Sequence, residues 1–546
     1  MNKKLLLWIF VMVCLVGLAN GTSCLSSCTL TGNHYKCTGS FTSCNVFDGV
    51  SKSVYIYDAT VTYAGSAGGT GADGGSGIIN ISSNNKVKLE NVVFTSTGGA
   101  GGAGSAGSAL PHGGDGGSAG LRITASSETL IDNISVTLTS GNGGVGDASN
   151  TYQSGNGGDG GEAIFVLNSP VYTMNDSDFD INSGTGALGE ANSYCPESDD
   201  DDARSATGGN GGKINFSVTS STSMSSKNNL LDADSGAGGN GHASACSRDS
   251  GADACGQEGY GGRIYVDFDV GYMDNNNFTI ETNVGAGGTA RCDCAGDSDA
   301  DIDGLDGSDS RITIDISNSS SSPNGFIFNS TSGNGGLGDG CSAGGDGDNC
   351  YDSNGGDGGF TYLTLKSAYD AVIWNNITLD IAGGTGAGND WSDDNCPCPQ
   401  AGDGGGFYYY GYNISIIGGN SWDIDSQAGT NANDAGSGGH GGDVYFYFYG
   451  ENKWKDLIID ILSGTGGTSN SGACYTGSGF PKCPGRGGDI QFISDNTFTK
   501  DNVTITTTAG NGGGGSCTGT STGFGLGGDT IFSGISLYLN GSSDIQ

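Results

Sequence analysis

Apolar and polar residues alternate along this chain in short runs, and each run directly follows a Gly-Gly pair. Examples are Lys213 to Val218, Arg263 to Phe268 and Arg311 to Ile316. A period of two is typical of a β-strand with one buried face. We therefore expect a strand after each Gly-Gly pair. Apolar rows should then lie above one another, such as Ile164, Ile214, Ile264 and Ile312.

A second strand-like run follows the first after a turn of about eight polar residues. It is represented by Asn133 to Leu138, Asn277 to Ile280 and Asn376 to Leu379. A Ser-Gly pair then opens a Gly-rich segment, as in Ser140 to Gly146. After a variable tip the chain returns through another Gly-rich segment, as in Ser154 to Gly161.

This four-part pattern repeats along the chain. The second glycine of the Gly-Gly pair falls at Gly75, Gly117, Gly161, Gly212, Gly262, Gly307 (a degenerate copy), Gly359, Gly405, Gly442, Gly488 and Gly528. Successive copies lie 37 to 52 residues apart, and self-similarity at such a period marks a solenoid. One unit cannot bury its apolar face alone, whereas stacked units can.

The predicted fold is all-β, a right-handed parallel β-solenoid of about eleven units of about 45 residues with two strands per unit. Gly-Gly-X segments can adopt polyproline II geometry and approach one another closely. We therefore expect polyglycine-II-like arms on one side of the solenoid. The alternative is that these segments are flexible loops.

The chain begins with the features of an export signal. Lys3 and Lys4 precede an apolar run from Leu5 to Val16, and small residues follow up to Gly21. We expect a signal peptide over 1–21, a disulfide-containing cap over 22–64 that ends in a first strand from Ser53 to Tyr63, and Gly-rich solenoid repeats over 65–546. The mature protein should be extracellular or on the cell surface.

Composition narrows the partners. Of 546 residues 107 are Gly, and removal of the signal leaves 18 Lys+Arg (20 minus two) against 59 Asp+Glu, a net charge near −41. Such a surface repels nucleic acid and anionic lipid, and it attracts divalent cations or basic surfaces. The alternative is that the charge only keeps the protein soluble. No later stretch is apolar enough for a membrane span.

Sixteen cysteines remain after the signal, and an exported chain favours disulfides. Four lie in the cap: Cys24, Cys28, Cys37 and Cys44. Twelve lie in the variable tips: Cys195, Cys246, Cys255, Cys292, Cys294, Cys341, Cys350, Cys396, Cys398, Cys474, Cys483 and Cys517. One scheme joins neighbouring tips, 195–246, 255–292, 294–341, 350–396, 398–474 and 483–517. The other schemes pair cysteines within a tip or use them as metal ligands.

Asp299, Asp301 and Asp303, with Asp309 further on, match the opening of a calcium loop. The acid expected at the twelfth position is missing, so the alternative is a solvated acidic tip. A second hypothesis is a column of stacked aspartates at Asp443, Asp489 and Asp529 that holds ions. No other cofactor is expected.

Asparagine recurs near the start of the second strand, at Asn91, Asn133, Asn175, Asn277, Asn376 and Asn502. We interpret these residues as an asparagine ladder whose amides hydrogen-bond along the stack. Asn133, Asn277, Asn376 and Asn502 are also candidate N-glycosylation sites.

The sequence gives little support for catalysis. The mature chain has four His, far apart in sequence, and its Gly-x-Gly-x-x-Gly matches lack the context of a cofactor site. Aromatic density peaks at Phe407 to Tyr410 and Tyr445 to Tyr449, where one strand face must be core. The other face exposes a tyrosine stripe suited to carbohydrate or surface binding, unless arms or a neighbour cover it.

The Gly-Gly-x-[Ile/Phe/Val] start of the first strand and the Asn-x-x-[Ile/Phe] second strand resemble those of parallel β-helix surface adhesins, over about residues 65 to 540. The Gly-rich arms are similar to those of polyglycine-sandwich phage adhesins and Gly-rich antifreeze proteins. The resemblance implies a secreted structural or adhesive protein of the cell surface, matrix or extracellular filament. It would assemble with itself or bind extracellular glycans. The alternatives are a carbohydrate- or surface-binding module, ice binding included, and a polysaccharide-active enzyme.

Overall fold

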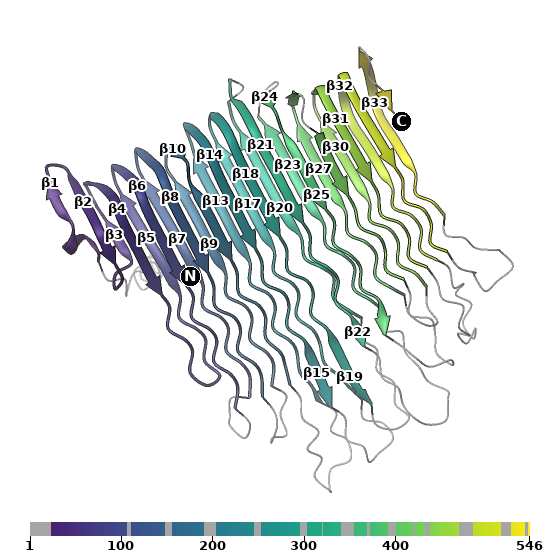
Figure 1. Cartoon of the computed structure of the whole chain (residues 1–546), viewed down its shortest axis with the longest axis horizontal. Helices are drawn as coiled ribbons and strands as arrows, with labels where there is room; N and C mark the ends of the chain where they lie inside the picture. Colours follow the sequence, from purple (N-terminus) through teal and green to yellow (C-terminus); the bar gives the residue numbers. More distant parts are fainter. Residues whose placement is uncertain are drawn as a thin grey trace, which may run out of the picture.

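A computed structural model describes residues 23–105, 111–147, 155–190, 204–244, 253–294, 303–318, 320–339, 354–368, 372–390, 400–418, 421–431, 437–468, 484–514, 526–540 and 544–545. The expected signal peptide lies outside these residues. The described chain is all-β, and one large, mostly parallel sheet dominates it (Figure 1). No helix in the described part is long or apolar enough to cross a membrane.

The strands that follow the Gly-Gly pairs form one parallel row, here called the A strands. Each pairs with the equivalent strand of the next turn, as Ile214 pairs with Ile264. The A strands are β5 (Gly77–Ser83), β7 (Ala119–Ala125), β9 (Ala163–Asn168), β13 (Ile214–Ser220), β17 (Ile264–Val270), β20 (Ser310–Ile316), β23 (Thr361–Ser367), β27 (Phe407–Tyr412), β30 (Val444–Tyr449), the start of β32 (Ile490–Thr508) and β33 (Thr530–Asn540).

The second strands, here called the B strands, form the other parallel row and alternate with the A strands in sequence. They are β4 (Ser53–Ala64), β6 (Lys86–Thr97), β8 (Glu128–Thr139), β10 (Val171–Asn175) with β11 (Asp178–Asn182), β14 (Ser223–Asp234), β18 (Met273–Asn283), β21 (Ser322–Thr331), β24 (Val372–Asn375) with β25 (Thr378–Ala382), β28 (Ile414–Ile417) with β29 (Ser421–Asp425), β31 (Asn452–Leu462) and the rest of β32. The short β34 (Asp544–Ile545) pairs with β32.

The expected eight-residue turn between the two strands is wrong. Only two residues separate β5 from β6. Most of the polar run is itself the first part of the second strand, and this part ends at a bend. Lys86–Thr97 has buried residues at alternate positions on each side of Asn91. The polar outward residues of this first part hid the alternation in the sequence.

The bend is a left-handed corner residue present in each described turn. Positive φ falls at Asp58, Asn91, Asn133, Asp176, Asn228, Asn277, Gly325, Asn376, Gly418, Asp456 and Asn502. Asparagine, aspartate and glycine tolerate this conformation, whereas a β-branched residue is strained there. The predicted position Asn175 is wrong, because the corner of that turn is Asp176.

The corner side chains form the predicted ladder. The Asn91 amide donates to Asp58 Oδ1 at 2.9 Å, and the Asn133 amide donates to Asn91 Oδ1 at 2.8 Å. The Asn502 amide donates to Asp456 Oδ1 at 2.8 Å. Where a turn carries glycine, an asparagine from a neighbouring turn lies close: a Cβ on Gly325 would be 2.5 Å from Asn277 Oδ1.

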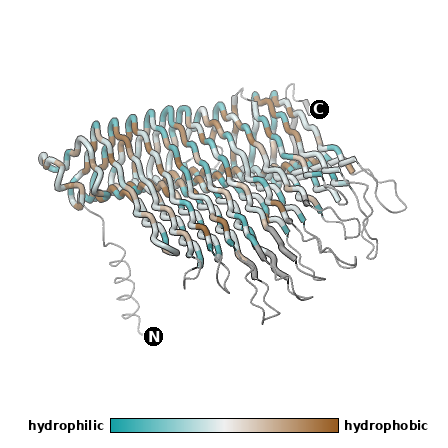
Figure 2. The backbone as a smooth tube through the Cα atoms, turned by 60° about the horizontal axis from the view of Figure 1, so that its bottom comes forward, coloured by the Kyte–Doolittle hydropathy of each residue, from teal (hydrophilic) through white to brown (hydrophobic). Residues whose placement is uncertain are grey.

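The core lies between the A and B strands and runs the length of the stack (Figure 2). Phe165 and Phe216 stack at 4.7 Å between ring centroids, and Trp374, Trp422 and Trp454 are fully buried. The predicted row of isoleucines is wrong in part. Ile214 and Ile264 share a row, but Ile164 pairs with Asn215, and Ile312 lies over Val266. In a run as apolar as Ala163 to Leu167, the pattern alone does not fix which face is buried.

The N-terminal segment covers the first turn. Its elements are η1 (Leu25–Ser27), β1 (Thr29–Thr31), β2 (His34–Phe41) and β3 (Val46–Asp48). Disulfides join Cys24 to Cys44 and Cys28 to Cys37. One edge of β2 pairs in parallel with β4, and its other edge pairs with the antiparallel β1. An antiparallel strand there blocks the open edge of the parallel sheet.

Short strands pair the described parts of the tips: β12 (Arg204–Ser205), β15 (Gly241–Ser244), β16 (Asp253–Cys255), β19 (Ala290–Cys294), β22 (Gly338–Asp339) and β26 (Asn389–Asp390). β16 and β19 come from consecutive turns and are antiparallel, with Cys255 opposite Cys292. Of the tip cysteines only Cys255, Cys292 and Cys294 fall within the described backbone; Cys195, Cys246, Cys341, Cys350, Cys396, Cys398, Cys474, Cys483 and Cys517 lie outside it.

The corner can be tested at Asn228, which is not part of a glycosylation sequon. Asn228→Val should lower the free energy of unfolding by about 1–3 kcal/mol, because a β-branched residue is strained at positive φ and the ladder bond to Asp176 is lost. Asn228→Gly, the matched control, keeps the conformation and should cost less. Chemical denaturation of both variants measures the difference. Equal losses would show that backbone strain plays no part.

The tips give a covalent prediction. The register of β16 and β19 is the one that a Cys255–Cys292 bond requires, since directly opposed residues in antiparallel strands have adjacent Cβ atoms. We expect non-reducing peptide mapping by mass spectrometry to recover Cys255 and Cys292 in one linked species. Linkage of Cys255 to Cys246, within the same tip, would contradict the neighbouring-tip scheme.

Candidate binding surfaces

Between each B strand and the next A strand the chain runs out and back beside the strand stack (Figure 1). We call the two halves the outgoing and returning segments. Outgoing segments of consecutive turns bond to each other at every third residue. Gly68 N–H donates to the Ala100 carbonyl at 2.8 Å, and Gly101 N–H donates to the Asn142 carbonyl at 2.8 Å. Returning segments do the same, as Gly116 N–H donates to the Asp159 carbonyl at 2.7 Å.

A second set of backbone bonds joins the outgoing layer to the returning layer. Gly99 N–H donates to the Gly75 carbonyl at 2.8 Å, and Gly117 N–H donates to the Gly99 carbonyl at 2.7 Å. The layers approach so closely that no side chain fits at this position. A Cβ on Gly143, in an outgoing segment, would lie 1.8 Å from the carbonyl oxygen of Gly158, in a returning segment. This contact requires the inner glycine of each triplet.

The third residue of each triplet, here called X, faces outward. Where X is Asp, Asn or His, its side chain can accept the N–H of the X residue in the next turn. Asp115 N–H donates to Asp73 Oδ1 at 3.0 Å, and Asp159 N–H donates to Asp115 Oδ1 at 2.9 Å. Further along, His440 N–H donates to Asp403 Oδ1 at 2.6 Å, and Arg486 N–H donates to His440 Nδ1 at 2.8 Å. The recurring Asp, Asn and His of the Gly-Gly-X triplets signalled this column, which the sequence reasoning missed.

Serine at the start of the outgoing segment joins the arms to the strand stack. Ser183 Oγ donates to the Gly212 carbonyl at 2.6 Å and accepts Gly236 N–H at 2.9 Å. Ser463 repeats both bonds with Gly488 and Gly510 at 2.6 and 2.7 Å. The serine hydroxyl of each such Ser-Gly pair therefore connects three neighbouring segments by hydrogen bonds to their backbones.

The calcium-loop residues divide between described and undescribed parts of the chain. Asp299 and Asp301 lie outside the described residues. Asp303 Oδ1 accepts the backbone and side-chain N–H groups of Asn354, at 3.2 and 2.8 Å. Asp309 Oδ1 accepts Phe360 N–H at 3.1 Å. Both are members of X columns, in different triplets, and the described residues contain no group of three His, Cys, Asp or Glu arranged for a metal. Calcium binding stays a prediction.

The aspartate column at the start of the A strands is present. Asp489 N–H donates to Asp443 Oδ1 at 2.7 Å, and Asp529 N–H donates to Asp489 Oδ1 at 2.9 Å. Arg486 forms an ion pair with Asp489 at 2.8 Å. The Asp443 and Asp489 carboxylates are thus occupied by N–H donors, and with Asp357, Phe360, Asp403 and His440 they line a shallow groove along the returning face. Burial, with the charges of Asp403 and Asp306, raises the pKa of Asp357 to about 6.

The tyrosine stripe covers the outward face of β23, β27 and β30, beside this groove. Phe407 and Tyr409 point into the core, whereas Tyr408 and Tyr410 are partly exposed. Rings on adjacent strands stack nearly parallel: Tyr362–Tyr408 at 5.0 Å, Tyr408–Tyr445 at 4.9 Å, Tyr410–Tyr447 at 5.2 Å and Tyr412–Tyr449 at 4.6 Å between centroids. At least one face of each of these rings is therefore covered by a neighbouring tyrosine, and the ring edges and hydroxyls remain for a ligand.

Charged groups border the stripe. The Arg311 guanidinium lies 4.8 Å from the Tyr362 ring centroid, and the Tyr445 hydroxyl donates to Asp443 Oδ2 at 2.9 Å. Burial and the Asp309 carboxylate raise the pKa of Tyr362 to about 12, although Arg311 opposes this shift. Burial also raises the pKa of Tyr408 and Tyr410. The hydroxyls thus stay protonated and can donate hydrogen bonds.

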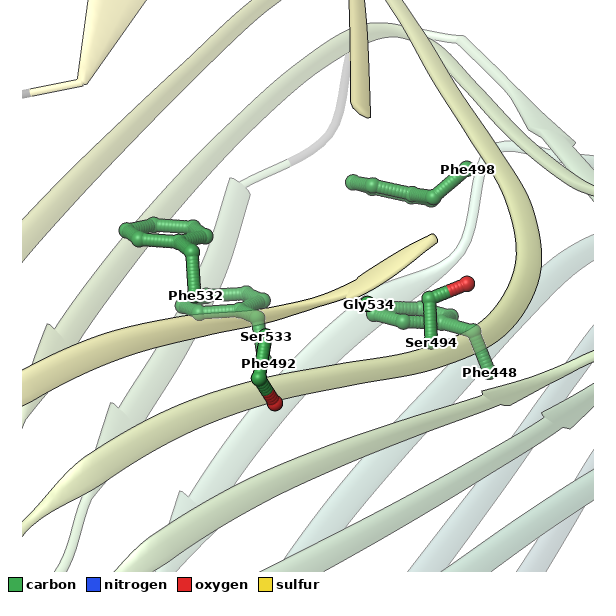
Figure 3. A pocket seen from close by; sticks show the side chains of 7 residues that line it. All are labelled: Phe448, Phe492, Ser494, Phe498, Phe532, Ser533 and Gly534. Carbon is green, nitrogen blue, oxygen red and sulfur yellow. The ribbon is translucent and has the colours of Figure 1, made fainter. Parts of the chain in front are cut away.

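A small apolar pocket lies at the end of the stack, lined by Phe448, Phe492, Phe498 and Phe532 with Ser494, Ser533 and Gly534 (Figure 3). Phe492 stacks on Phe532 at 4.7 Å, and Phe448 stacks on Phe498 at 4.4 Å. These rings continue the core column, and Phe532 is 37% exposed. The pocket belongs to the core, and its polar side chains are those of Ser494 and Ser533.

The candidate glycosylation sites Asn133, Asn277, Asn376 and Asn502 all lie exposed at corners. Their amide nitrogens donate to the ladder, as Asn376 Nδ2 does to Asn324 Oδ1 at 2.8 Å. A glycan would share this nitrogen with the ladder bond. Glycosylation stays a prediction.

Glu258 stands in a returning segment at a position where the neighbouring turns have Gly208 and Gly304. It is buried, and its carboxylate accepts Leu305 N–H. Burial, with a smaller contribution from the charge of Asp303, raises the pKa of Glu258 to about 7.

Comparisons with protein-family models, with curated proteins and with solved structures give no match for this chain. Its function is therefore argued from the geometry alone.

The contact between the layers is testable at one glycine. Gly143→Ala should destabilise the arms by about 1–3 kcal/mol or more, because its Cβ would overlap the Gly158 carbonyl of the opposite layer. Thr185→Ala, at an outward position of the next turn, is the matched control and should leave stability unchanged. Limited proteolysis read by mass spectrometry measures both. Equal resistance of both variants would contradict the close approach of the layers.

Glu258 gives a pH prediction. Its folded pKa of about 7 exceeds its ordinary value of 4.5, so the folded state binds the proton more tightly. The resulting stability is present below pH 4.5 and is lost as pH rises toward 7. Glu258→Gln keeps an acceptor for Leu305 N–H and should raise stability at pH 8 by about 1–3 kcal/mol.

Denaturation at pH 4.5 and pH 8 measures this effect, and the variant should show the smaller change between them. Glu162→Gln, an exposed glutamate of the same segments, is the control and should follow the wild type. If Glu258→Gln kept the wild-type difference between the two pH values, the assigned shift would be wrong.

Proposed function

We propose that this protein is a secreted structural or adhesive component of a cell surface, matrix or extracellular filament. It is a right-handed solenoid of about eleven turns of about 45 residues, and its Gly-rich segments form polyglycine-II-like arms on one side. It acts through repeated faces and not through one catalytic site. The two cap disulfides are compatible with export, since disulfides persist in oxidising compartments.

The two-layer hydrogen bonding of the arms carries this proposal. In a Gly-Gly-X triplet one N–H bonds to the next turn, one to the opposite layer and one to an X side chain, as for Gly116, Gly117 and Asp115. A loop needs none of these bonds, and a catalytic scaffold needs no plate of this extent. Paired backbone groups on a repeated surface favour a rigid structural element.

Negative-stain electron microscopy of the mature protein, purified with its disulfides intact, tests the proposal. We expect rods that associate laterally or end to end into paired rods or filaments as the concentration rises. Lone rods at every concentration, with no retention on extracellular matrix material, would contradict a structural or adhesive role.

The tyrosine stripe favours a second candidate function, binding to a polysaccharide surface. Its hydroxyls lie in a grid set by the strand spacing of about 4.8 Å, and tyrosine combines apolar contact with a hydrogen-bonding group. Because the ring faces are stacked, such a ligand would lie across ring edges and hydroxyls.

Retention on insoluble polysaccharides tests this candidate. The double variant Tyr410→Ser, Tyr447→Ser should lose most of any retention. Tyr55→Ser, Tyr57→Ser removes two partly exposed tyrosines near the N-terminal end and is the matched control. Equal retention of both variants would assign the binding to another surface.

A further inference from the structure

The outgoing layer and the returning layer each have an outer face, and these two faces differ in charge. On the returning face the X positions include Asp73, Asp115, Asp159, Asp303, Asp306, Asp357 and Asp403. On the outgoing face the X positions of the two triplets next to the strands carry no charged residue in any described turn. The column nearer the strands is Ala67, Ala100, Asn142, Thr185, Ala237, Ala286, Asn334, Thr385, Ala428, Thr465 and Asn511.

The second column of this face, nearer the tips, is Thr70, Ala103, Val145, Leu188, Asn240, Thr289, Leu337, Gly388, Asn431, Thr468 and Gly514. Val145 is 41% exposed and Leu337 is 43% exposed, so apolar side chains project from it. Acids stand only at the margins, with Asp147 toward the tips and Asp234 and Asp425 beside the strands. In a chain with 59 Asp+Glu, an uncharged strip of this length is a distinct surface.

The hydrogen bonds along this face need acceptors but not neutral ones. Thr185 N–H donates to Asn142 Oδ1 at 3.0 Å, and Thr385 N–H donates to Asn334 Oδ1 at 2.9 Å. On the returning face aspartate performs the same role, as Asp115 does for Asp159 at 2.9 Å. The hydrogen bonds between neighbouring X residues can be made by either Asn or Asp. These bonds therefore do not explain why the outgoing face uses Asn and Thr.

We propose that the outgoing face docks against the outgoing face of a second copy of this chain. This inference rests on the proposed structural function and names the surface that self-association uses. A second copy is itself acidic, so the acidic faces of the two copies repel each other and the copies can approach only where charge is lacking. The acidic residues at the margins then stay at a solvated rim. A two-fold axis relates the two faces, so both copies contribute the same columns to the interface.

The dimensions are sufficient for a stable pair. From Ala100 to Asn511 the inner column crosses about nine steps of about 4.8 Å, and two triplets span about six residues at about 3.1 Å. The product is about 800 Å² on each copy, which is the size of a standard interface. Small X side chains keep the face flat, and columns of one copy can lie between columns of the other.

Isosteric substitutions test the proposal without changing the lattice. The triple variant Asn142→Asp, Asn240→Asp, Asn334→Asp keeps each Oδ1 that accepts a backbone N–H and adds three charges to the outgoing face. The matched control, Asn156→Asp, Gln257→Glu, Gln400→Glu, adds three charges to X positions of the returning face. Circular dichroism and thermal melting check that both variants fold.

Sedimentation velocity over a range of protein concentrations is the measurement. We expect the wild type and the control to form dimers, and the apparent dissociation constant of the outgoing-face variant to rise at least 100-fold, since charges then oppose like charges. If the wild type formed dimers and the outgoing-face variant formed them equally well, the inference would be overturned and the structural function would still stand.

A wild type that is monomeric at every concentration would overturn the inference and, with negative-stain images of lone rods, self-assembly itself. Monomers whose retention on a crystalline polysaccharide or on ice is lost only in the outgoing-face variant would also overturn it. In that case the face binds a regular external surface and not a second copy.

Discussion

Backbone hydrogen bonding between superposed turns is the constraint on which this structure depends. Where the chain is a strand, the parallel ladder pairs the backbone N–H and carbonyl groups of each turn, as β13 pairs with β17. Where it leaves the strand stack there is no ladder, and buried backbone groups still need partners. The arms meet this need with three kinds of bond: along a layer, between the layers, and to a side chain of the neighbouring turn.

That constraint explains which residue occupies which position. Glycine stands where the layers meet because the Gly158 carbonyl leaves no room for a Cβ on Gly143. Asp, Asn or His stands at many X positions because the N–H of the X residue in the next turn needs an acceptor. Arg486 N–H, for example, donates to His440 Nδ1. Asparagine stands at the corners because it tolerates positive φ and bonds to the next corner, as Asn133 does to Asn91. The Gly-rich composition thus records geometry, not flexibility.

Part of this could be predicted from the sequence. The alternation after each Gly-Gly pair identified the A strands, and recurring asparagines identified the ladder, because both patterns repeat at a fixed position in each turn. The part of the second strand before the corner was missed because its outward residues, such as Lys86, Lys88 and Glu90, are polar and its inward ones are few.

The acceptor columns could not be derived from composition, since Asp in a Gly-rich run is equally typical of a turn or a calcium loop. Asp303 illustrates this, because its carboxylate accepts two N–H groups of Asn354. The tyrosine stripe was located correctly, but the sequence did not show that stacking leaves mainly ring edges and hydroxyls for a ligand. Only the spacing of neighbouring turns reveals that Tyr408 lies between Tyr362 and Tyr445.

The most direct measurement of the central claim is hydrogen–deuterium exchange of the mature chain, resolved by peptide. If superposed turns pair their backbones throughout, amides of the Gly-rich segments 97–105 and 111–118 exchange as slowly as those of β6 and β8. Exchange of these segments within seconds, beside protected strands, would mean that the arms are unpaired loops and would contradict the account.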